Sequence, residues 1–365
     1  MTALPTLTTP FILPALVVPF LLAYLFSVLG VYLSIAIARR LKRLDQPGDR
    51  SSHSPPIPRF GGLGIGAGFF IGLFLYSSAD LSDSTTVAIV LGTSIALVFG
   101  FLDELRQIPA LPKLAFQCVC AALPLLFNLH FETIRLGQMS WPVPIPAVVT
   151  FFWILFFMNG FNFMDGIDGQ AGVFGIFATC SVAVPALMMW RVFPDVYFMA
   201  LTSFVLAGAL LGFLRFNMRT PARTFMGDCG SQMVGYILAM LLVISPPAFI
   251  LPICLAYWPF IFDVSFTLVR RTVARKNLLA AHRDHLYQRL LRSGMSHRQV
   301  LRRQVPFFFV CLMASLYSTY GYLAKARATE FLMSAMIVIA ATVAYTAYVY
   351  SVERAFILKQ PQVQE

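Results

Sequence analysis

Charged residues are scarce in this sequence. Asp, Glu, Lys and Arg make up 12% of its 365 residues, whereas they make up roughly 25% of a typical soluble domain. Hydrophobic residues make up 58%, which excludes a soluble globular protein and indicates an integral membrane protein. Negatively charged residues are fewer than positively charged ones, with 16 Asp and Glu against 27 Lys and Arg. The basic excess suits anionic lipid headgroups or a phosphorylated substrate, and we expect no nucleic-acid partner.

Cysteine is also sparse, and its placement excludes a disulfide framework. The six cysteines lie in apolar runs or at their ends, with no pair in an outside loop and no metal-type spacing. We expect free thiols that act mostly as packing groups. No internal repeat of the kind that builds many transporters is present. The first apolar run has no basic segment ahead of it, so we interpret it as a retained helix rather than a signal peptide.

Long apolar runs fill the rest of the chain. A helix that crosses a membrane needs about 20 mostly apolar residues, and a strand barrel would show short alternating segments instead. The fold class is therefore all-α, a polytopic membrane protein with about 10–11 transmembrane helices. The eleven candidate spans are 12–38, 60–78, 86–102, 112–128, 147–161, 170–190, 196–214, 230–245, 247–268, 305–323 and 331–351.

The basic residues predict the orientation of these helices. With the N-terminus outside, 23 of the 27 Lys and Arg fall in inside segments, as the positive-inside rule requires. We expect a single transmembrane domain over 1–365, with an active site at the cytoplasmic face and a polar tail over 353–365. The inside loops are rich in Gly, Pro, Arg, His and Asp, a composition typical of binding loops. They are 39–59, 103–113, 159–170, 215–228 and 270–304.

Two of these loops combine acidic and basic residues. The segment DQPGDRSSHSPPIPRFGG carries His53 and Arg59, which suit a phosphate, although a plain basic loop beside the membrane fits them equally well. The segment GFLDELRQIPALPK carries Asp103 and Glu104 at a helix end, followed by Lys113. Acids there oppose the helix dipole, which favours metal coordination or proton handling over simple solvated acids.

The segment NGFNFMDGIDG gives the strongest signal. It carries four oxygen-bearing side chains and three glycines between two apolar runs, which predicts a broken or tightly turned helix end. Oxygen ligands favour magnesium over softer metals, and the pattern lacks the terminal Glu of a calcium loop. The four side chains are Asn159, Asn162, Asp165 and Asp168.

The segment RTFMGDCGSQMVG stands just before a predicted helix. Its Gly-Asp-x-Gly-Ser pattern offers backbone N–H groups for phosphate and the carboxylate of Asp228 for a divalent ion. Phe225 is placed to stack on a base. A role for Asp228 as a simple helix cap is the alternative interpretation.

The last inside loop is basic. Its His282, Arg283 and His285 suit a pyrophosphate. Leucines at helical spacing also predict a helix lying along the membrane interface: Leu278, Leu279, Leu286, Leu290 and Leu291. We interpret Asp263 as a structural partner of the basic cluster that begins at Arg270.

Taken in order, these five motifs resemble the polyprenyl-phosphate N-acetylhexosamine-1-phosphate transferases. The resemblance runs from Asp45 to Arg292: D-x-P-x-x-R-x-x-H, an acidic pair with a downstream Lys, N-x-x-N-x-x-D-G-x-D-G, F-M-G-D-x-G-S, and an Arg/His-rich loop. It implies transfer of a sugar-1-phosphate from a UDP-N-acetylhexosamine to undecaprenyl phosphate, giving a lipid-linked diphospho-sugar and UMP.

The resemblance also implies roles for individual residues. Asp228 matches the principal ligand of Mg²⁺, with Mn²⁺ as an alternative ion and Asn162 close by. Asp168 matches a residue near the uracil, on which Phe225 stacks. The catalytic set implied is Asp103, Glu104, Lys113, Asp165, Asp168 and Asp228. The substrate-binding set is His53, Arg59, Asn159, Asn162, Asp168, Phe225, His282, Arg283 and His285.

Two positions depart from the family pattern. The usual second aspartate of the acidic pair is Glu104, and an HxHH motif reads His285-Leu286-Tyr287-Gln288. This variant looks like the branch that initiates O-antigen or capsule synthesis in a bacterial inner membrane, and it leaves the sugar open. Membrane lipids are expected neighbours, and a homodimer is left open. A membrane-embedded lipid phosphatase and an ion-coupled transporter are the rival interpretations.

Overall fold

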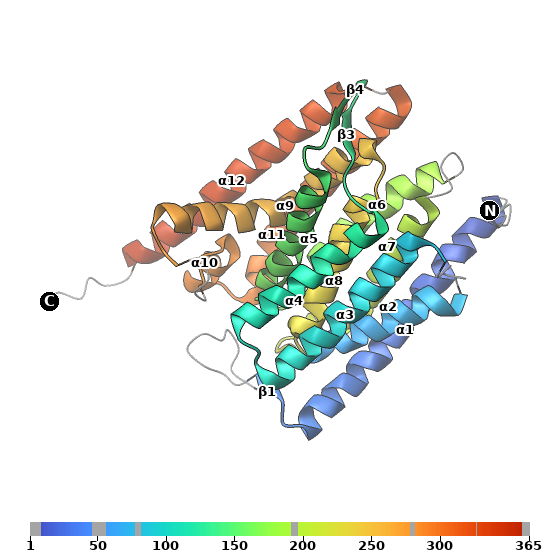
Figure 1. Cartoon of the computed structure of the whole chain (residues 1–365). Coiled ribbons are helices and arrows are strands. Elements are labelled where there is room, and N and C mark those ends of the chain that lie inside the picture. The colour runs from blue at the N-terminus through green and yellow to red at the C-terminus, as the bar shows by residue number, and fades with distance from the viewer. Residues whose placement is uncertain are drawn as a thin grey trace. The chain divides into compact units, whose positions relative to one another are not determined.

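The computed structural model describes residues 9–45, 56–76, 82–190, 196–277, 282–325 and 327–359 (Figure 1). These residues are mostly helical. The helices are α1 (Thr9–Arg40), α2 (Gly61–Tyr76), α3 (Ser84–Arg106), α4 (Ala110–Ala122), the 3-10 helix η1 (Leu123–Phe127), α5 (Pro146–Met164), α6 (Gln170–Met189), α7 (Val196–Asn217), α8 (Gly227–Val243), α9 (Pro247–Val273), α10 (Leu286–Arg292), α11 (His297–Lys325) and α12 (Thr329–Lys359). Two short sheets are present: β1 (Leu44–Asp45) pairs antiparallel with β2 (Ile57–Pro58), and β3 (Thr133–Leu136) pairs with β4 (Met139–Pro142).

Each of the eleven predicted spans overlaps a helix, which confirms an all-α polytopic membrane protein. Nine helices of the described chain are long and apolar enough to cross a membrane by length and composition. The other two, α2 and α8, are apolar but have only 16 and 17 residues. Cys229 to Val243 of α8 are all buried inside the protein, so this helix is surrounded mostly by other helices.

The described chain forms two compact units, a division that the sequence did not indicate. Unit 1 comprises Met1–Arg135 and Met139–Ile250, and unit 2 comprises Leu136–Gln138 and Leu251–Glu365. Helix α9 begins in the first unit and continues into the second. Four of the five sequence motifs therefore belong to unit 1, and the last basic loop belongs to unit 2.

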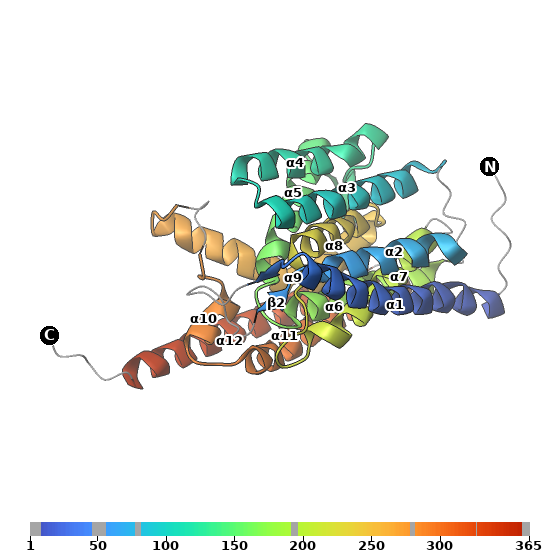
Figure 2. The ribbon, with the colours of Figure 1, turned by 90° about the horizontal axis from the view of Figure 1, so that it is seen from below.

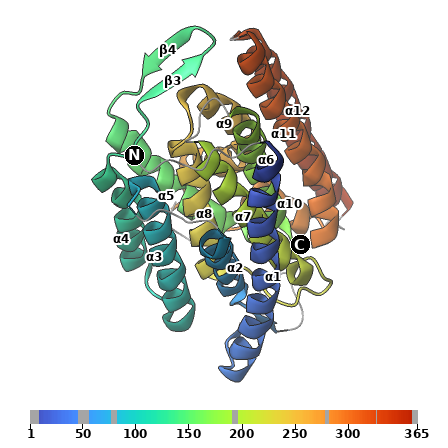
Figure 3. The ribbon, with the colours of Figure 1, turned by 90° about the vertical axis from the view of Figure 1, so that its right-hand side faces the viewer.

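Unit 1 packs its helices closely through small residues. Helices α1, α2 and α7 lie side by side (Figure 3), and a Cβ added to Gly64 of α2 would come within 2.4 Å of Val31 in α1. Ser27 of α1 donates a hydrogen bond to the Ala209 carbonyl of α7 over 2.7 Å. On the other side of α8, helices α3, α4 and α5 form a second group (Figure 2). These contacts place the ends of α3, α5 and α8 near one another.

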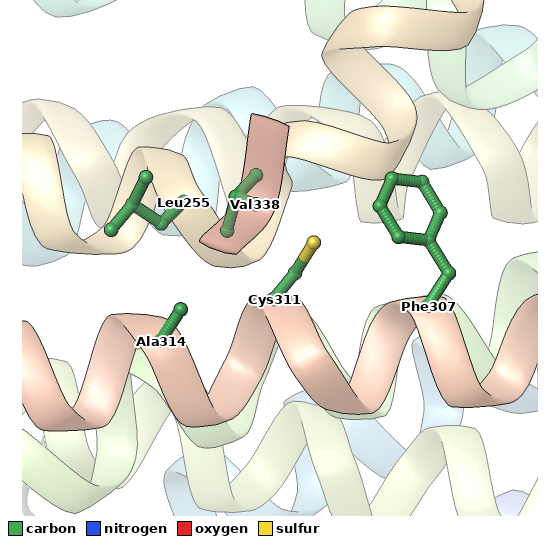
Figure 4. Close-up of a cluster of buried hydrophobic side chains, with 5 residues drawn as sticks. All are labelled: Leu255, Phe307, Cys311, Ala314 and Val338. Atoms are coloured by element: carbon green, nitrogen blue, oxygen red, sulfur yellow. The ribbon is translucent and has the colours of Figure 1, made fainter. Parts of the chain in front are cut away.

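Unit 2 has its own apolar core between α9, α11 and α12 (Figure 4). Its five buried side chains are Leu255, Phe307, Cys311, Ala314 and Val338. The indole N–H of Trp258 donates to the Thr342 hydroxyl over 2.9 Å, which ties α9 to α12 beside this core. Cys311 and the other five cysteines are free thiols, as predicted.

Several helices extend beyond the spans predicted from the apolar runs. Helix α8 begins at Gly227 rather than near residue 230, so Asp228 lies inside its first turn. Helix α12 continues to Lys359, so the predicted polar tail is helical from 353 to 359. Glu353 in this extension forms ion pairs with Arg289 and Arg292 of the same unit. Helix α11 also begins earlier, at His297 rather than 305.

The predicted membrane-surface helix was wrong over its described part. Helix α10 has only seven residues, and Leu286 and Leu290 are 1% and 0% exposed. Burial in the unit removes them from a membrane surface, while Leu278 and Leu279 lie outside the described residues. The short ribbons β1–β2 and β3–β4 occupy segments that we expected to be loops.

Candidate active site

The candidate site lies at the N-terminal end of α8, where three backbones approach closely. A Cβ added to Gly62 of α2 would lie 2.1 Å from the Gly230 nitrogen, and one added to Gly100 of α3 would lie 2.5 Å from the Asp228 carbonyl oxygen. Any side chain at either glycine would push α8 away, which explains why glycine occupies both positions. The first turn of α8 is therefore fixed against two neighbouring helices.

The segment that precedes α8 is fixed by backbone hydrogen bonds. The Phe225 N–H donates to the Pro58 carbonyl over 2.9 Å, and the Gly61 N–H donates to the Phe225 carbonyl over 3.0 Å. The Gly62 N–H donates to the Met226 carbonyl over 2.8 Å. Phe225 is half-buried, and these bonds fix its backbone between β2 and the start of α2.

Lys113 of α4 joins the acids of two other helices. Its Nζ lies 2.7 Å from Oδ2 of Asp103 on α3 and 2.8 Å from Oδ2 of Asp228 on α8. The other oxygen of Asp103 accepts a hydrogen bond from the Ile108 N–H over 2.8 Å. This bond becomes possible because Gln107 ends α3 in the left-handed conformation and turns the chain back. Asp228 thus pairs with a lysine and does not act only as a cap.

Glu104 has a different environment from its neighbour. Its Oε1 accepts a hydrogen bond from the Cys229 N–H over 3.1 Å, at the positive end of the α8 dipole. Its Oε2 is buried and has no hydrogen-bond partner within the described residues. A Cβ added to Gly227 would meet both Glu104 Oε1 and the Arg59 carbonyl, so the backbone of Arg59 lies here too. The Arg59 side chain is exposed.

The turn between α5 and α6 brings Asp165 to the same place. Its Oδ2 accepts a hydrogen bond from the Gly227 N–H over 3.2 Å. Burial raises the pKa of Asp165 well above its ordinary value of 3.8, and the charges of Asp228 and Asp168 act in the same direction. One turn earlier, Asn162 accepts a hydrogen bond from the Ser231 hydroxyl over 3.0 Å. Asp165 and Asn162 therefore both contact α8.

Asn217 is a residue of this region that the sequence did not single out. Its Oδ1 accepts from the Gly169 N–H over 2.7 Å and its Nδ2 donates to the Thr224 carbonyl over 2.9 Å. It thereby connects the Asp168 turn to the segment that carries Phe225. Its only signal in the sequence is a polar residue at the end of an apolar run. Asn159, by contrast, donates back to the Leu155 carbonyl of its own helix over 2.9 Å.

The predicted residues of the basic loop lie in unit 2. His285 is 2% exposed, and its Nδ1 lies 3.5 Å from Oδ1 of Asp263. The same Asp263 oxygen accepts a hydrogen bond from the Leu286 N–H over 2.9 Å, so Asp263 caps α10. Burial lowers the pKa of His282 from 6.5 to about 4, and the charges of His285 and Arg271 act in the same direction. Arg283 is half-buried beside it.

Asp284, next to His285, is the centre of a cluster of basic side chains in unit 2. Asp284 forms ion pairs with Arg271, Lys276 and Arg292. Burial alone would raise the pKa of Asp284, but the Arg271 hydrogen bond and the charges of Lys276 and Arg271 lower it below 3.8. His53 of the predicted substrate set lies outside the described residues.

The oxygen-rich site fits a hard divalent cation by its chemistry. Asp103 and Asp228 place carboxylate oxygens on two sides of the Lys113 ammonium group. A hard divalent cation is bound by oxygens of the same kind. The buried Oε2 of Glu104 is a further oxygen without a partner among the described residues. In the described part of the chain, however, no three His, Cys, Asp or Glu side chains already converge on one point as a metal site.

Comparisons with known proteins match the same region. The family model of glycosyl transferase family 4 matches residues 86–246, from α3 to the end of α8. A probable undecaprenyl-phosphate N-acetylglucosaminyl 1-phosphate transferase of Bacillus subtilis is 31% identical over 76% of this chain and 78% of that protein. A decaprenyl-phosphate N-acetylglucosaminephosphotransferase of Mycobacterium tuberculosis (strain ATCC 25618 / H37Rv) is 28% identical over 73% of both chains.

A third relative extends the match over most of the chain. An undecaprenyl-phosphate alpha-N-acetylglucosaminyl 1-phosphate transferase of Escherichia coli (strain K12) is 25% identical over 91% of this chain and 90% of that protein. The matched family region contains the site residues of unit 1 from Asp103 to Asp228.

Proposed function

The chain belongs to glycosyl transferase family 4, with the polyprenyl-phosphate N-acetylglucosamine-1-phosphate transferases, and from this premise we propose its reaction. It transfers N-acetylhexosamine-1-phosphate from a UDP-sugar to undecaprenyl phosphate. The products are an undecaprenyl-diphospho-sugar and UMP. We place the reaction at the cytoplasmic face of a bacterial inner membrane and assign it to the start of O-antigen or capsule-type synthesis.

The observation that carries this proposal is the joint contact of Lys113 with Asp103 and Asp228. These three side chains come from three helices, and Glu104, Asp165 and the first turn of α8 adjoin them. A phosphoryl transfer between two anions needs positive charge and fixed donors where the phosphates meet. Lys113 supplies both in one place, and the dipole of α8 adds to the positive charge there.

The charge of the site indicates a required cation. Five carboxyl groups lie in this region, where Lys113 pairs with two of them and the charge of Arg59 acts on Glu104: Asp103, Glu104, Asp165, Asp168 and Asp228. Such a site repels a nucleotide diphosphate unless protons or metal ions reduce its negative charge. The raised pKa of Asp165 reduces it in part. We therefore propose Mg²⁺ at Asp228 and Asn162, where it supplies positive charge to the phosphates, with Mn²⁺ as an alternative.

The chain's own residues then position the two substrates. The lipid phosphate is largely dianionic at neutral pH, because the second pKa of a phosphomonoester is near 6, and it needs no general base. Its oxygen attacks the phosphorus attached to the sugar, a new P–O bond forms, and the P–O bond to UMP breaks. Lys113 offsets the repulsion between the anions. Phe225 stacks on the uracil beside Asp168, which holds the donor in line for direct attack.

The roles of the remaining site residues follow from their contacts. Glu104 and Asp165 hold the first turn of α8 through the Cys229 and Gly227 N–H groups, so we assign them the placement of Asp228. We assign Arg59, Asn159, His282, Arg283 and His285 to substrate binding on the family resemblance.

The test is a transfer assay with purified protein. The protein is incubated with undecaprenyl phosphate, Mg²⁺ and a panel of UDP-N-acetylhexosamines, and UMP and lipid-linked sugar are measured. We expect equal amounts of both products from at least one donor, and loss of both after Asp228→Asn. Release of inorganic phosphate from the lipid would instead identify a phosphatase. A general-base role for Asp103 is excluded if Asp103→Asn keeps near-normal turnover.

A further inference from the structure

A buried amide pair lies one helical turn from the Lys113–Asp228 contact. Gln117 of α4 donates through Nε2 to Oε1 of Gln232 on α8 over 3.1 Å. The two residues are 2% and 3% exposed. Gln117 follows Lys113 by four positions, and Gln232 follows Asp228 by four positions. The two contacts are therefore successive links between the same helix faces, about 6 Å apart along each axis.

The direction of the links shows how they act together. Residue numbers rise on both helices from the first link to the second, so α4 and α8 run in the same direction across them. A slip of α4 by one residue, about 1.5 Å, would break both links at once. The amide pair therefore sets the register at which the Lys113 ammonium reaches both Asp103 and Asp228.

The pair is costly as a packing element. Gln232 Nε2 is buried and has no hydrogen-bond partner within the described residues. Two leucines of similar size would fill the same space without leaving a polar atom unsatisfied, and such replacements of both partners are often neutral or stabilising. Two glutamines at this position are thus explained better by the geometry they impose than by the stability they add.

Other contacts fix α8 on its remaining sides. Tyr236, four positions beyond Gln232, donates to the Ala88 carbonyl of α3 over 2.8 Å. The Trp153 indole of α5 donates to the Ala239 carbonyl over 3.3 Å. Helix α4, by comparison, packs mainly against α3 and α5. The hydrogen bonds of Lys113 and Gln117 to α8 therefore determine how α4 is placed along α8.

We propose that Gln117 and Gln232 are positioning residues that set Lys113 between Asp103 and Asp228 for the phosphate transfer. The proposal deepens the proposed function and rests on it for the catalytic readout. Neither glutamine touches the reacting groups, so both act through Lys113 and Asp228.

The kinetic test compares three variants with one control. Gln117→Leu and Gln232→Leu should each lower kcat about tenfold, equivalent to about 1.4 kcal/mol. The KM for the UDP-sugar should stay within about twofold, because the donor's own contacts remain. The Gln117→Leu/Gln232→Leu double variant should regain the thermal stability of the wild type while its kcat stays low. Trp153→Phe removes a hydrogen bond to a distant part of α8 and should keep near-normal kcat.

Two kinetic results would overturn the proposal. If the double variant has wild-type kcat, the pair serves packing alone. If Trp153→Phe lowers kcat as much as Gln117→Leu does, the effect is a general loosening of α8.

A stability test does not depend on the reaction. The loss of melting temperature caused by Lys113→Met should be smaller in the Gln117→Leu background, because Lys113 is already displaced there. Strictly additive losses would refute the positioning role even if the wild-type protein released no UMP from any donor. Absence of UMP from the wild type would contradict the proposed function, whereas additive losses contradict only the inference about the glutamines.

Discussion

Replacement of Lys113 by methionine removes the ammonium group that contacts both Asp103 and Asp228. The side chains of the three residues are 22%, 6% and 28% exposed, so Asp103 is nearly buried and Asp228 is partly solvated. Breaking a buried ion pair costs about 3–5 kcal/mol, because it leaves an uncompensated charge. Since Asp228 reaches water and Asp103 keeps its bond from Ile108, we expect a loss near the lower end, about 3 kcal/mol.

The assay is unfolding of the purified protein in mixed micelles, with and without Mg²⁺. A divalent cation that binds between the two carboxylates should restore stability to Lys113→Met, by about 2.7 kcal/mol at 100 times its dissociation constant. UMP release should fall at least about 100-fold, because Lys113 also offsets the repulsion between the substrates. The two measurements separate the structural part of the lysine from its part in the transfer.

Lys42→Met is the matched control, because Lys42 is exposed beyond the end of α1. Surface substitutions of this kind usually change stability by less than about 0.5 kcal/mol. If Lys113→Met is no less stable than Lys42→Met, the electrostatic role of Lys113 is wrong. If Mg²⁺ stabilises Lys113→Met no more than it stabilises Lys42→Met, no divalent cation takes the place of the lysine between Asp103 and Asp228.

Three further outcomes follow from the geometry. The folded-state pKa of Asp165 lies above the unfolded value of 3.8, so the folded form loses stability as pH rises through that raised pKa. Asp165→Asn removes this loss, so the melting temperature of the variant relative to the wild type should increase from pH 5 to pH 8. A difference that does not change with pH contradicts the raised pKa of Asp165. Phe225→Leu should raise the KM for the UDP-sugar about tenfold at near-constant kcat, as expected for one lost base stack of about 1–3 kcal/mol; a loss of kcat alone argues against stacking. Glu353→Gln breaks the ion pair with Arg289 and should destabilise the protein by about 1–3 kcal/mol, read as a lower melting temperature, and an unchanged value would show that this pair is only a surface contact.

The sequence predicted the helices well because helix formation is local. Each of the eleven apolar runs supplies the length and the side chains for a helix, and each backbone hydrogen bond closes within four residues. The glycines after Asn159 likewise predicted the break between α5 and α6, where Gly169 adopts φ +83°. The motif composition also predicted which segments carry carboxylates, and Asp103, Asp165 and Asp228 indeed lie at neighbouring helix ends.

Only the tertiary structure decided which partner each side chain takes. Lys113 and Asp228 are 115 residues apart in the chain, as are Gln117 and Gln232. No local pattern distinguishes these glutamines from others in apolar runs. The same holds for Asn217, whose contacts with Gly169 and Thr224 arise from the packing of separate segments.

One physical cause explains why the sequence predicts the helices but not the partners of their side chains. Apolar composition and short-range hydrogen bonding determine that a segment is helical, and the sequence contains both. The register between two helices depends on how glycines such as Gly62 and Gly100 let backbones approach, and on which buried polar groups then come within hydrogen-bonding distance. That register, rather than the presence of the acids, places Lys113 between Asp103 and Asp228.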